Sequence, residues 1–182
     1  MSQNIITRTI KHFNLITRHR WIVFKLCCKA GIPLQGLVHD LSKFSPVEFW
    51  QSVEFYNGNM SPLLLAKRKY GYSKAWLHHK GRNKHHPEYW YDPRSRNPMV
   101  LVPYKYTVEM ICDNLAAGII YNGKRWTKDT QLKYWNQRKE NVPLNEKNKL
   151  VLTDIFTQIS INGIDAVITK KNLKKSYNKY CK

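Results

Sequence analysis

The sequence lacks a long apolar run, and it has few cysteines. None of its segments has about 18 consecutive apolar residues. The first residues, MSQNIITRTIKHFN, are polar where a signal peptide needs an apolar stretch. We therefore expect a cytoplasmic protein with no membrane partner. The four cysteines form no Cys-x-x-Cys pair, which fits a reducing compartment and a buried or idle role for the thiols.

Acidic residues are also scarce. Asp and Glu total 12 against 31 Lys and Arg, so the formal net charge is +19. This excess favours an anionic partner, such as a nucleotide, a nucleic acid or an acidic surface. Basic side chains are concentrated between residues 66 and 105, where the only acids are Glu88 and Asp92, and in the tail KKNLKKSYNKYCK, which has no acid.

The periodicity of the apolar residues predicts an all-α protein with one domain. Long periodic segments follow the helical spacing, and no alternating strand pattern extends beyond a few residues. We expect a helical domain over residues 1–160 and a basic helix or tail over 161–182. The expected helices cover 17–30, 34–44, 46–57, 62–80 with a break near residue 71, 104–121, 126–140 and 144–159. Ser45 and Glu48 form an expected capping box, and the irregular connection 81–103 is long enough to suggest a functional role.

Histidines are clustered in a way that suggests a metal site. Five of the seven fall in two short motifs, HD at 39–40 and LHHKGRNKHHPEYW at 77–90. Neutral imidazoles and carboxylates together are suitable ligands for a transition metal. The apolar residues Leu37 and Val38 directly precede His39 and Asp40, which suggests that the helix carries His39 and Asp40 into the interior. A buried Asp40 carboxylate needs a positive partner, which is either Lys43 or a metal ion.

Other candidates have two interpretations each. His12 lies off the neighbouring apolar set and is expected at the surface. Of two adjacent histidines, His79 is closer to the loop and is the preferred ligand, while His78 is expected to pack or face solvent. Glu109 and Asp113, four residues apart, repel each other unless a cation lies between them or one turns away. They are therefore either ligands or a solvated pair.

The order of these residues resembles that of the HD-domain metal phosphohydrolases. In that superfamily an early His, an adjacent His-Asp and a late Asp hold one metal ion, and additional histidines hold a second, as in the HD-GYP phosphodiesterases. The GYP stretch is absent, so the cyclic-dinucleotide specificity is not implied. The chain up to about residue 160 is more closely similar to uncharacterised short HD-like proteins of bacteria and phages, through the pattern HDLSKFSPxEF…WLxHKxxNxHHxEYW…EMICD.

The resemblance implies a single HD-like helical bundle with a metal site between its helices. The implied cofactor is one or two divalent transition-metal ions, such as manganese, iron or zinc, and Asp40 would bridge the two. The first ion would take three further ligands, His19, His39 and Asp113. The second would take His79, His85 and His86.

The implied activity is that of a metal-dependent phosphohydrolase or phosphodiesterase. Its substrate would be a nucleotide, a single-stranded nucleic acid or another phosphate ester. Asp40 and Lys43 would act in catalysis, and Lys43 would hold either Asp40, which we favour, or a phosphate oxygen. The expected substrate-binding residues are Arg82, Asn83, Lys84 and Lys105, and the carboxylates expected to orient a histidine are Glu88 and Glu109. The alternative is a basic nucleic-acid-binding module on an HD-like scaffold with little or no catalysis.

Overall fold

The computed structural model describes residues 4–58 and 60–182, and it is all-α. No β-strand occurs in this described part of the chain, where a single antiparallel bridge joins Tyr91 and Met99. The α-helices are α1 Ile5–Lys29, α2 Pro33–Val38, α3 Pro46–Glu54, α4 Pro62–Tyr70, α5 Lys74–Arg82, α6 Tyr104–Asn122, α7 Thr130–Arg138, α8 Glu146–Asn162, α9 Ile164–Val167 and α10 Lys170–Cys181. The short 3-10 helices are η1 Leu41–Phe44, η2 Pro87–Trp90, η3 Gly123–Arg125 and η4 Lys139–Asn141.

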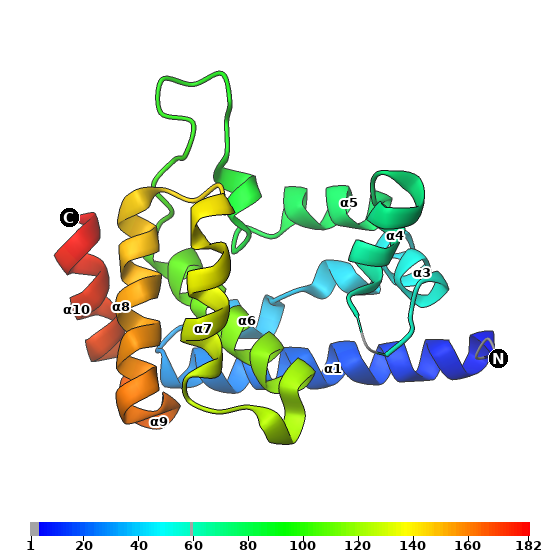
Figure 1. The fold of residues 1–182 in the computed structure, drawn as a ribbon, viewed down its shortest axis with the longest axis horizontal. Helices are drawn as coiled ribbons and strands as arrows, with labels where there is room; N and C mark the ends of the chain where they lie inside the picture. Colours follow the sequence, from blue (N-terminus) through cyan, green and yellow to red (C-terminus); the bar gives the residue numbers. More distant parts are fainter. Residues whose placement is uncertain (1–3, 59) are drawn as a thin grey trace.

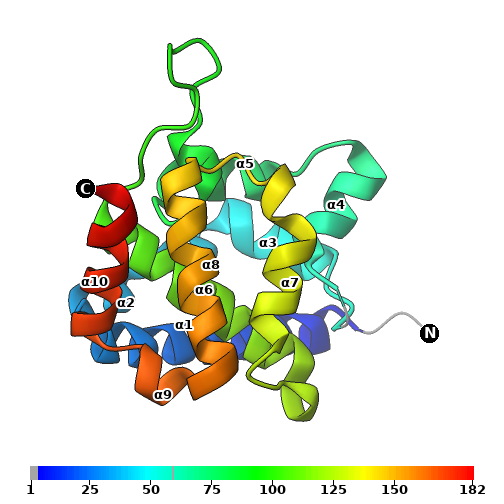
Figure 2. The ribbon, with the colours of Figure 1, turned by 60° about the vertical axis from the view of Figure 1, so that its left-hand side comes forward.

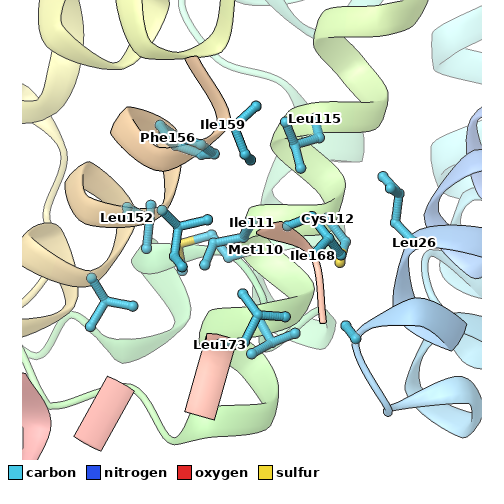
Figure 3. Packing of buried hydrophobic residues seen from close by; sticks show 14 of the residues in the cluster. Leu26, Met110, Ile111, Cys112, Leu115, Leu152, Phe156, Ile159, Ile168 and Leu173 are labelled. Atoms are coloured by element: carbon cyan, nitrogen blue, oxygen red, sulfur yellow. The ribbon is translucent and has the colours of Figure 1, made fainter. Parts of the chain in front are cut away.

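Helix α6 is the central element of the core. Its residues Ile111, Cys112 and Leu115 are fully buried. Leu115 lies near Ile159 of α8, whereas Cys112 lies on the side of α6 that faces Leu26 of α1 (Figure 3). Burying one such side chain contributes about 1.5–3 kcal/mol to the free energy of unfolding. The core therefore fixes the rotation of α6 about its own axis.

Helices α1, α2, α7, α8 and α10 pack against α6. In Figure 1, α1 runs along the bottom of the molecule, and α8 and α10 lie at its left. After a turn of the view by 60°, α7 and α8 are seen side by side in front of α6 (Figure 2). The basic tail forms α10, which packs against α8 and α6. The short helix α9 precedes it. The expected domain boundary at residue 160 falls near the end of α8 and stays a prediction.

Two features of the described residues relate to the expectations about membrane spans and cysteines. No helix among them is long and apolar enough to cross a membrane. All four cysteines are free, and Cys27, Cys112 and Cys181 are buried whereas Cys28 is exposed. The burial of three of the four thiols agrees with the buried role expected for them.

The helix predicted over residues 34–44 is wrong as a continuous element. Helix α2 ends at Val38, and η1 begins at Leu41. Leu37 and Val38 are 57% and 52% exposed, so these two apolar side chains do not pack into the core. His39 and Asp40 are nonetheless buried, because the break between the two helices turns their side chains inward.

The predicted capping box is also wrong. Ser45 is the N-cap of α3, but its side chain makes no capping hydrogen bond. Glu48 does not turn back toward Ser45, because it lies on the buried face of α3 together with Ser52 and Val53. Its carboxylate instead contacts histidines of α5.

His12 is buried, which contradicts its expected place at the surface. Its exposed fraction is 6%, and its ring packs against Phe49 and Tyr56 at centroid distances of 5.5 and 5.8 Å. The imidazole Nδ1 has no hydrogen-bond partner. Burial, with a smaller contribution from the charge of Lys43, lowers the pKa of His12 to about 4. The histidine is thus neutral in the folded protein at neutral pH.

Replacing His12 by Phe should make folding less sensitive to acid. The unfolded state takes up the His12 proton near pH 6.5 and the folded state near pH 4, so the wild type loses stability as the pH falls through this window. We expect the stability of His12→Phe relative to wild type to rise by about 2–3 kcal/mol between pH 7 and pH 4. Urea denaturation of the two metal-free proteins measures this difference. A difference that does not change with pH would contradict the account.

Candidate metal centre

The centre is built around the break between α2 and η1. Asp40 has a φ of 54°, and it is the only residue other than glycine with a positive φ among those described. Two hydrogen bonds from the guanidinium of Arg20, each 2.8 Å, hold the carbonyl oxygens of His39 and Leu37. The left-handed turn directs the Asp40 side chain inward, where its exposed fraction is 1%.

The two carboxylate oxygens of Asp40 face different groups of ligands. Oδ1 lies 3.3 Å from His79 Nε2 and 3.4 Å from His85 Nε2. Oδ2 lies 3.3 Å from His39 Nε2 and 2.7 Å from Lys43 Nζ. Asp40 therefore stands between two clusters of ligand atoms and belongs to both.

The first cluster joins α1, the break and α6. It consists of His19, His39, Asp40 and Asp113. His19 Nε2 lies 3.0 Å from Asp113 Oδ1 and 3.3 Å from His39 Nε2. The buried faces of two long helices thus bring together residues that are far apart in the sequence.

The second cluster joins the break to α5 and the segment that follows it. It consists of Asp40, His79, His85 and His86. His79 Nε2 lies 2.9 Å from His86 Nε2. Asp40 Oδ1 and His85 Nε2 are buried without a hydrogen-bond partner. Unpaired buried polar atoms are costly, and a cation between them would satisfy both.

Two glutamates contact the Nδ1 atoms of three histidines of these clusters, on the opposite side of each ring from the Nε2 atom. Glu109 Oε1 lies 2.8 Å from His39 Nδ1 and 3.0 Å from His85 Nδ1. Glu48 Oε2 lies 2.7 Å from His79 Nδ1. A carboxylate that accepts the Nδ1 proton leaves Nε2 as the unprotonated ligand atom, so this arrangement directs three Nε2 lone pairs toward the clusters.

The carboxylates of the centre are ionised. Burial by itself raises the pKa of Asp40, but the positive charges of His39 and Lys43 outweigh it and hold this pKa well below its usual range. The pKa of Asp113 is also well below its usual range, because hydrogen bonds from His19 and His39 outweigh the effect of burial. Both oxygens of Asp40 are therefore available as ligands.

The histidines differ in their pKa. Burial lowers the pKa of His86 well below its usual range, and the charges of His85 and His79 lower it further. Burial also lowers the pKa of His19. In contrast, Asp40 and other carboxylates outweigh burial and raise the pKa of His39 well above its usual range. A metal ion would displace the proton of His39, because metal ligation needs a neutral imidazole.

The donor set and its spacing fit a transition metal. Histidine nitrogens and carboxylate oxygens suit ions such as zinc or manganese. Ligand atoms about 2.1 Å from one ion are about 3.0–3.4 Å from each other in octahedral or tetrahedral geometry. The distances of 2.9–3.4 Å between His79, His86, His85 and Asp40 lie close to this range. The clusters can therefore hold a metal ion. A third group of possible ligands, His39, His85 and Glu109, lies on the Nδ1 side of the two rings, where Glu109 Oε1 is 2.8 Å from His39 Nδ1 and 3.0 Å from His85 Nδ1.

A cavity of about 770 Å³ opens beside the centre. His85, His86 and Asp113 form part of its wall, and α6 and α7 form much of the remainder. The basic residues that line it are Arg125, Lys133 and Arg138. Its volume is typical of a small-molecule site.

The residues predicted to bind substrate lie elsewhere. Arg82, Asn83, Lys84 and Lys105 are not among the residues that line the cavity. Asn83 donates instead to Ser42 Oγ and to the carbonyl oxygen of His79, at 2.8 Å each. The expected role of these residues in substrate binding stays a prediction, while tertiary packing brings the basic residues Lys133 and Arg138 of α7 to the cavity.

The remaining candidates have mixed outcomes. Glu109 contacts two histidines, as expected of a carboxylate that orients them. One carboxylate oxygen of Glu88, Oε2, is buried without a hydrogen-bond partner, and the role expected of Glu88 stays a prediction. A carboxylate that the sequence did not single out, Glu48, contacts His79 Nδ1 at 2.7 Å. Glu48 shares the buried face of α3 with Ser52 and Val53, and its sequence context alone, which also fits a capping box, did not identify it. His78 Nδ1 donates a hydrogen bond to Glu48 Oε1 at 2.6 Å, and His78 is in neither Asp40 cluster.

Comparison with known proteins places the chain in a family. The family described as "Family of unknown function (DUF5662)" matches residues 8–158, and the chain therefore belongs to it. No curated protein and no solved structure matches the chain.

The left-handed conformation of Asp40 gives a prediction that does not depend on metal. Asp40→Gly and Asp40→Ala both remove the carboxylate, but only alanine keeps the steric cost of a positive φ. We expect the glycine variant to be more stable than the alanine variant by about 1 kcal/mol, measured by urea denaturation in the presence of a chelator.

The matched control is the exposed Lys25 inside α1. There the order should reverse, with Lys25→Ala about 1 kcal/mol more stable than Lys25→Gly. If alanine were the more stable replacement at both positions, the assigned conformation of Asp40 would be wrong.

Proposed function

We propose that this protein is a metal-dependent phosphohydrolase that cleaves a phosphate ester of a nucleotide. The observation that supports this most strongly is the position of Asp40, whose oxygens face two separate clusters of ligand atoms. We propose that two divalent ions such as manganese, iron or zinc occupy these clusters and share this carboxylate. The resemblance to the HD-domain metal phosphohydrolases, in the order of the ligands along the chain, supports the same reaction class.

The bound ions would lower the pKa of a water molecule and neutralise charge that develops on the phosphoryl oxygens. The protein contributes the positions of the ligands. Glu48 and Glu109 fix the histidine rings, and Lys43 holds Asp40 Oδ2 at 2.7 Å. Lys43 keeps its own charge, because Asp40 and Asp113 outweigh burial and raise its pKa. It therefore keeps Asp40 ionised and oriented.

The cavity supplies the substrate site in this proposal. Asp113 and His86 are at its wall, so a phosphoryl group in the cavity lies next to both clusters. Arg125, Lys133 and Arg138 place positive charge around the same space. Such charge attracts an anionic substrate and raises its local concentration.

Metal content tests the proposed ligands. Mass spectrometry of protein loaded with manganese, iron or zinc should find two ions per wild-type chain if each cluster holds one. Asp40→Ala should lose both, because it removes the shared ligand, whereas His86→Ala should lose one. The control is His12→Phe, which changes a buried histidine outside both clusters and should keep both ions. Equal metal content in all four proteins would reject the ligand assignment.

Turnover tests the activity and the position of the substrate. With metal supplied, the wild type should release phosphate from some member of a nucleotide panel, and Asp40→Ala should not. Lys133→Ala should raise KM about fivefold through the loss of about 1 kcal/mol of charge attraction. Lys84→Ala, the matched change of a lysine outside the cavity lining, should leave KM unchanged. If Lys84→Ala raised KM and Lys133→Ala did not, the substrate would bind at the connection 81–103 instead.

A second candidate is a basic nucleic-acid-binding module. It is favoured by the exposed lysines of α10, which include Lys170, Lys171, Lys174, Lys175 and Lys179. Such binding would weaken steeply with salt and would survive the loss of Asp40. Tight duplex binding that Asp40→Ala does not change, with no turnover on any nucleotide, would favour the module over the enzyme.

A further inference from the structure

An apolar stripe runs along one exposed side of helix α1, which lies along the bottom of the molecule in Figure 1. Four apolar side chains at helical spacing form the stripe: Ile6, Ile10, Phe13 and Trp21. Their exposed fractions range from 48% to 64%. The buried side of the same helix carries His19 to the metal centre. The stripe therefore belongs neither to the apolar core nor to the centre.

Helix α2 extends this apolar surface. Its Gly36 lies so close to α1 that a Cβ at this position would overlap the side chain of Cys27. The opposite side of α2 carries three exposed apolar side chains, Leu34, Leu37 and Val38. The ring of Trp21 stacks on Phe24 at a centroid distance of 5.6 Å, and the backbone of Phe24 adjoins Gly36. The Trp21 end of the stripe is therefore next to α2.

A row of basic side chains borders the stripe. Lys11, Arg18 and Lys25 are seven residues apart, so they lie in line along α1, and all three are exposed. The ammonium of Lys25 lies over the ring of Trp21, 5.9 Å from its centroid. The first 39 residues contain no Asp or Glu, so no acid of α1 or α2 neutralises the row. The stripe, the exposed side of α2 and the basic row together form the α1–α2 surface.

The charges beside the stripe select its occupant. Exposed apolar patches with a polar rim mark interaction sites. A second copy of the chain would bring the same basic row and the same net charge of +19, so the two copies would repel each other. A bilayer with anionic lipids places negative charge above apolar chains, which matches a basic row beside an apolar stripe. It also accepts protruding side chains without a matching pocket, such as Leu34 with its exposed fraction of 78%.

We propose that the α1–α2 surface binds the face of a bilayer that contains anionic lipids. The apolar side chains enter the boundary between headgroups and acyl chains, and the basic row contacts the lipid phosphates. Trp21 has the amphipathic ring that favours this boundary.

This contact needs no spanning helix, and none occurs among residues 4–58 and 60–182. It departs from the expectation of no membrane partner, which followed from the lack of a long apolar run. Such a lack excludes a spanning segment, whereas a surface contact uses side chains that are adjacent only in the folded protein. The proposal holds whether or not the metal centre is catalytic.

Vesicle sedimentation with the full chain tests the apolar part of the surface. The vesicles consist of phosphatidylcholine, alone or with about one-third phosphatidylserine. We expect the wild type to bind the anionic vesicles about tenfold or more tighter than the neutral ones. The double variant Leu34→Ser/Leu37→Ser should weaken that binding about tenfold. Its matched control, Leu77→Ser/Leu150→Ser, changes two half-exposed leucines of α5 and α8 and should bind as the wild type does.

Neutral replacements of basic residues test the charge. Arg18→Gln/Lys25→Gln removes two charges of the basic row, and binding to the anionic vesicles should fall about tenfold. Arg94→Gln/Arg96→Gln removes the same charge from exposed residues of the connection 81–103, which projects on the opposite side of the molecule from α1 (Figures 1 and 2). This control should change binding less than about twofold, because salt screens distant charges. All four variants should retain the melting temperature and metal content of the wild type, because each substitution is at the surface.

Three results would overturn the proposal. If the control in the connection 81–103 weakened binding as much as the variant of the basic row, the chain would adsorb through its net charge without a defined surface. A wild type that binds no vesicle and sediments as a dimer, which Leu34→Ser/Leu37→Ser dissociates, would identify a second copy as the occupant. A monomeric wild type that binds no vesicle would leave a protein partner as the occupant.

Discussion

The ionised carboxylate of Asp40 lies in the interior of a helical protein, and the arrangement of the surrounding elements compensates its charge. A buried charge is tolerated only when it is paired and hydrogen-bonded. Here the compensation comes from Lys43 at 2.7 Å and from histidines carried by α1, α5 and the segment after α5. Each of these elements contributes a side chain that would itself be costly to bury without Asp40. The centre therefore acts as a polar core beside the apolar one.

Helix α6 couples the two cores. Its apolar face, with Ile111 and Leu115, is fixed by contacts with α8 (Figure 3), and Glu109 and Asp113 project from the same helix toward the histidines. Because a helix rotates as a unit, packing on one side sets the position of the carboxylates on the other. A cavity-forming substitution on the apolar face would thus change the geometry of the ligands. The same helix extends past the centre to Gly118, so the apolar core also positions the wall of the cavity.

Much of this architecture is readable from the sequence, and the exceptions have physical causes. Apolar periodicity predicted α6, α7 and α8, and the motif residues His19, His39, His79, His85, His86 and Asp113 all meet around Asp40. The break at Asp40 was not predicted, because a left-handed aspartate is held by tertiary contacts such as those of Arg20 rather than by a local signal. Glu48 has a sequence context that also fits a capping box. The lining of the cavity by α7 depends on how helices distant in sequence pack, which periodicity does not specify.

The central claim is that two metal ions share the Asp40 carboxylate. Anomalous diffraction from crystals grown with manganese, recorded near the manganese absorption edge, tests it directly. The account predicts two anomalous peaks roughly 3.5–4 Å apart, one beside each oxygen of Asp40, with His39 and Asp113 at the first and His79 and His86 at the second. No peak at Asp40, or a single ion held by Glu109 and the Nδ1 atoms of His39 and His85, would contradict it.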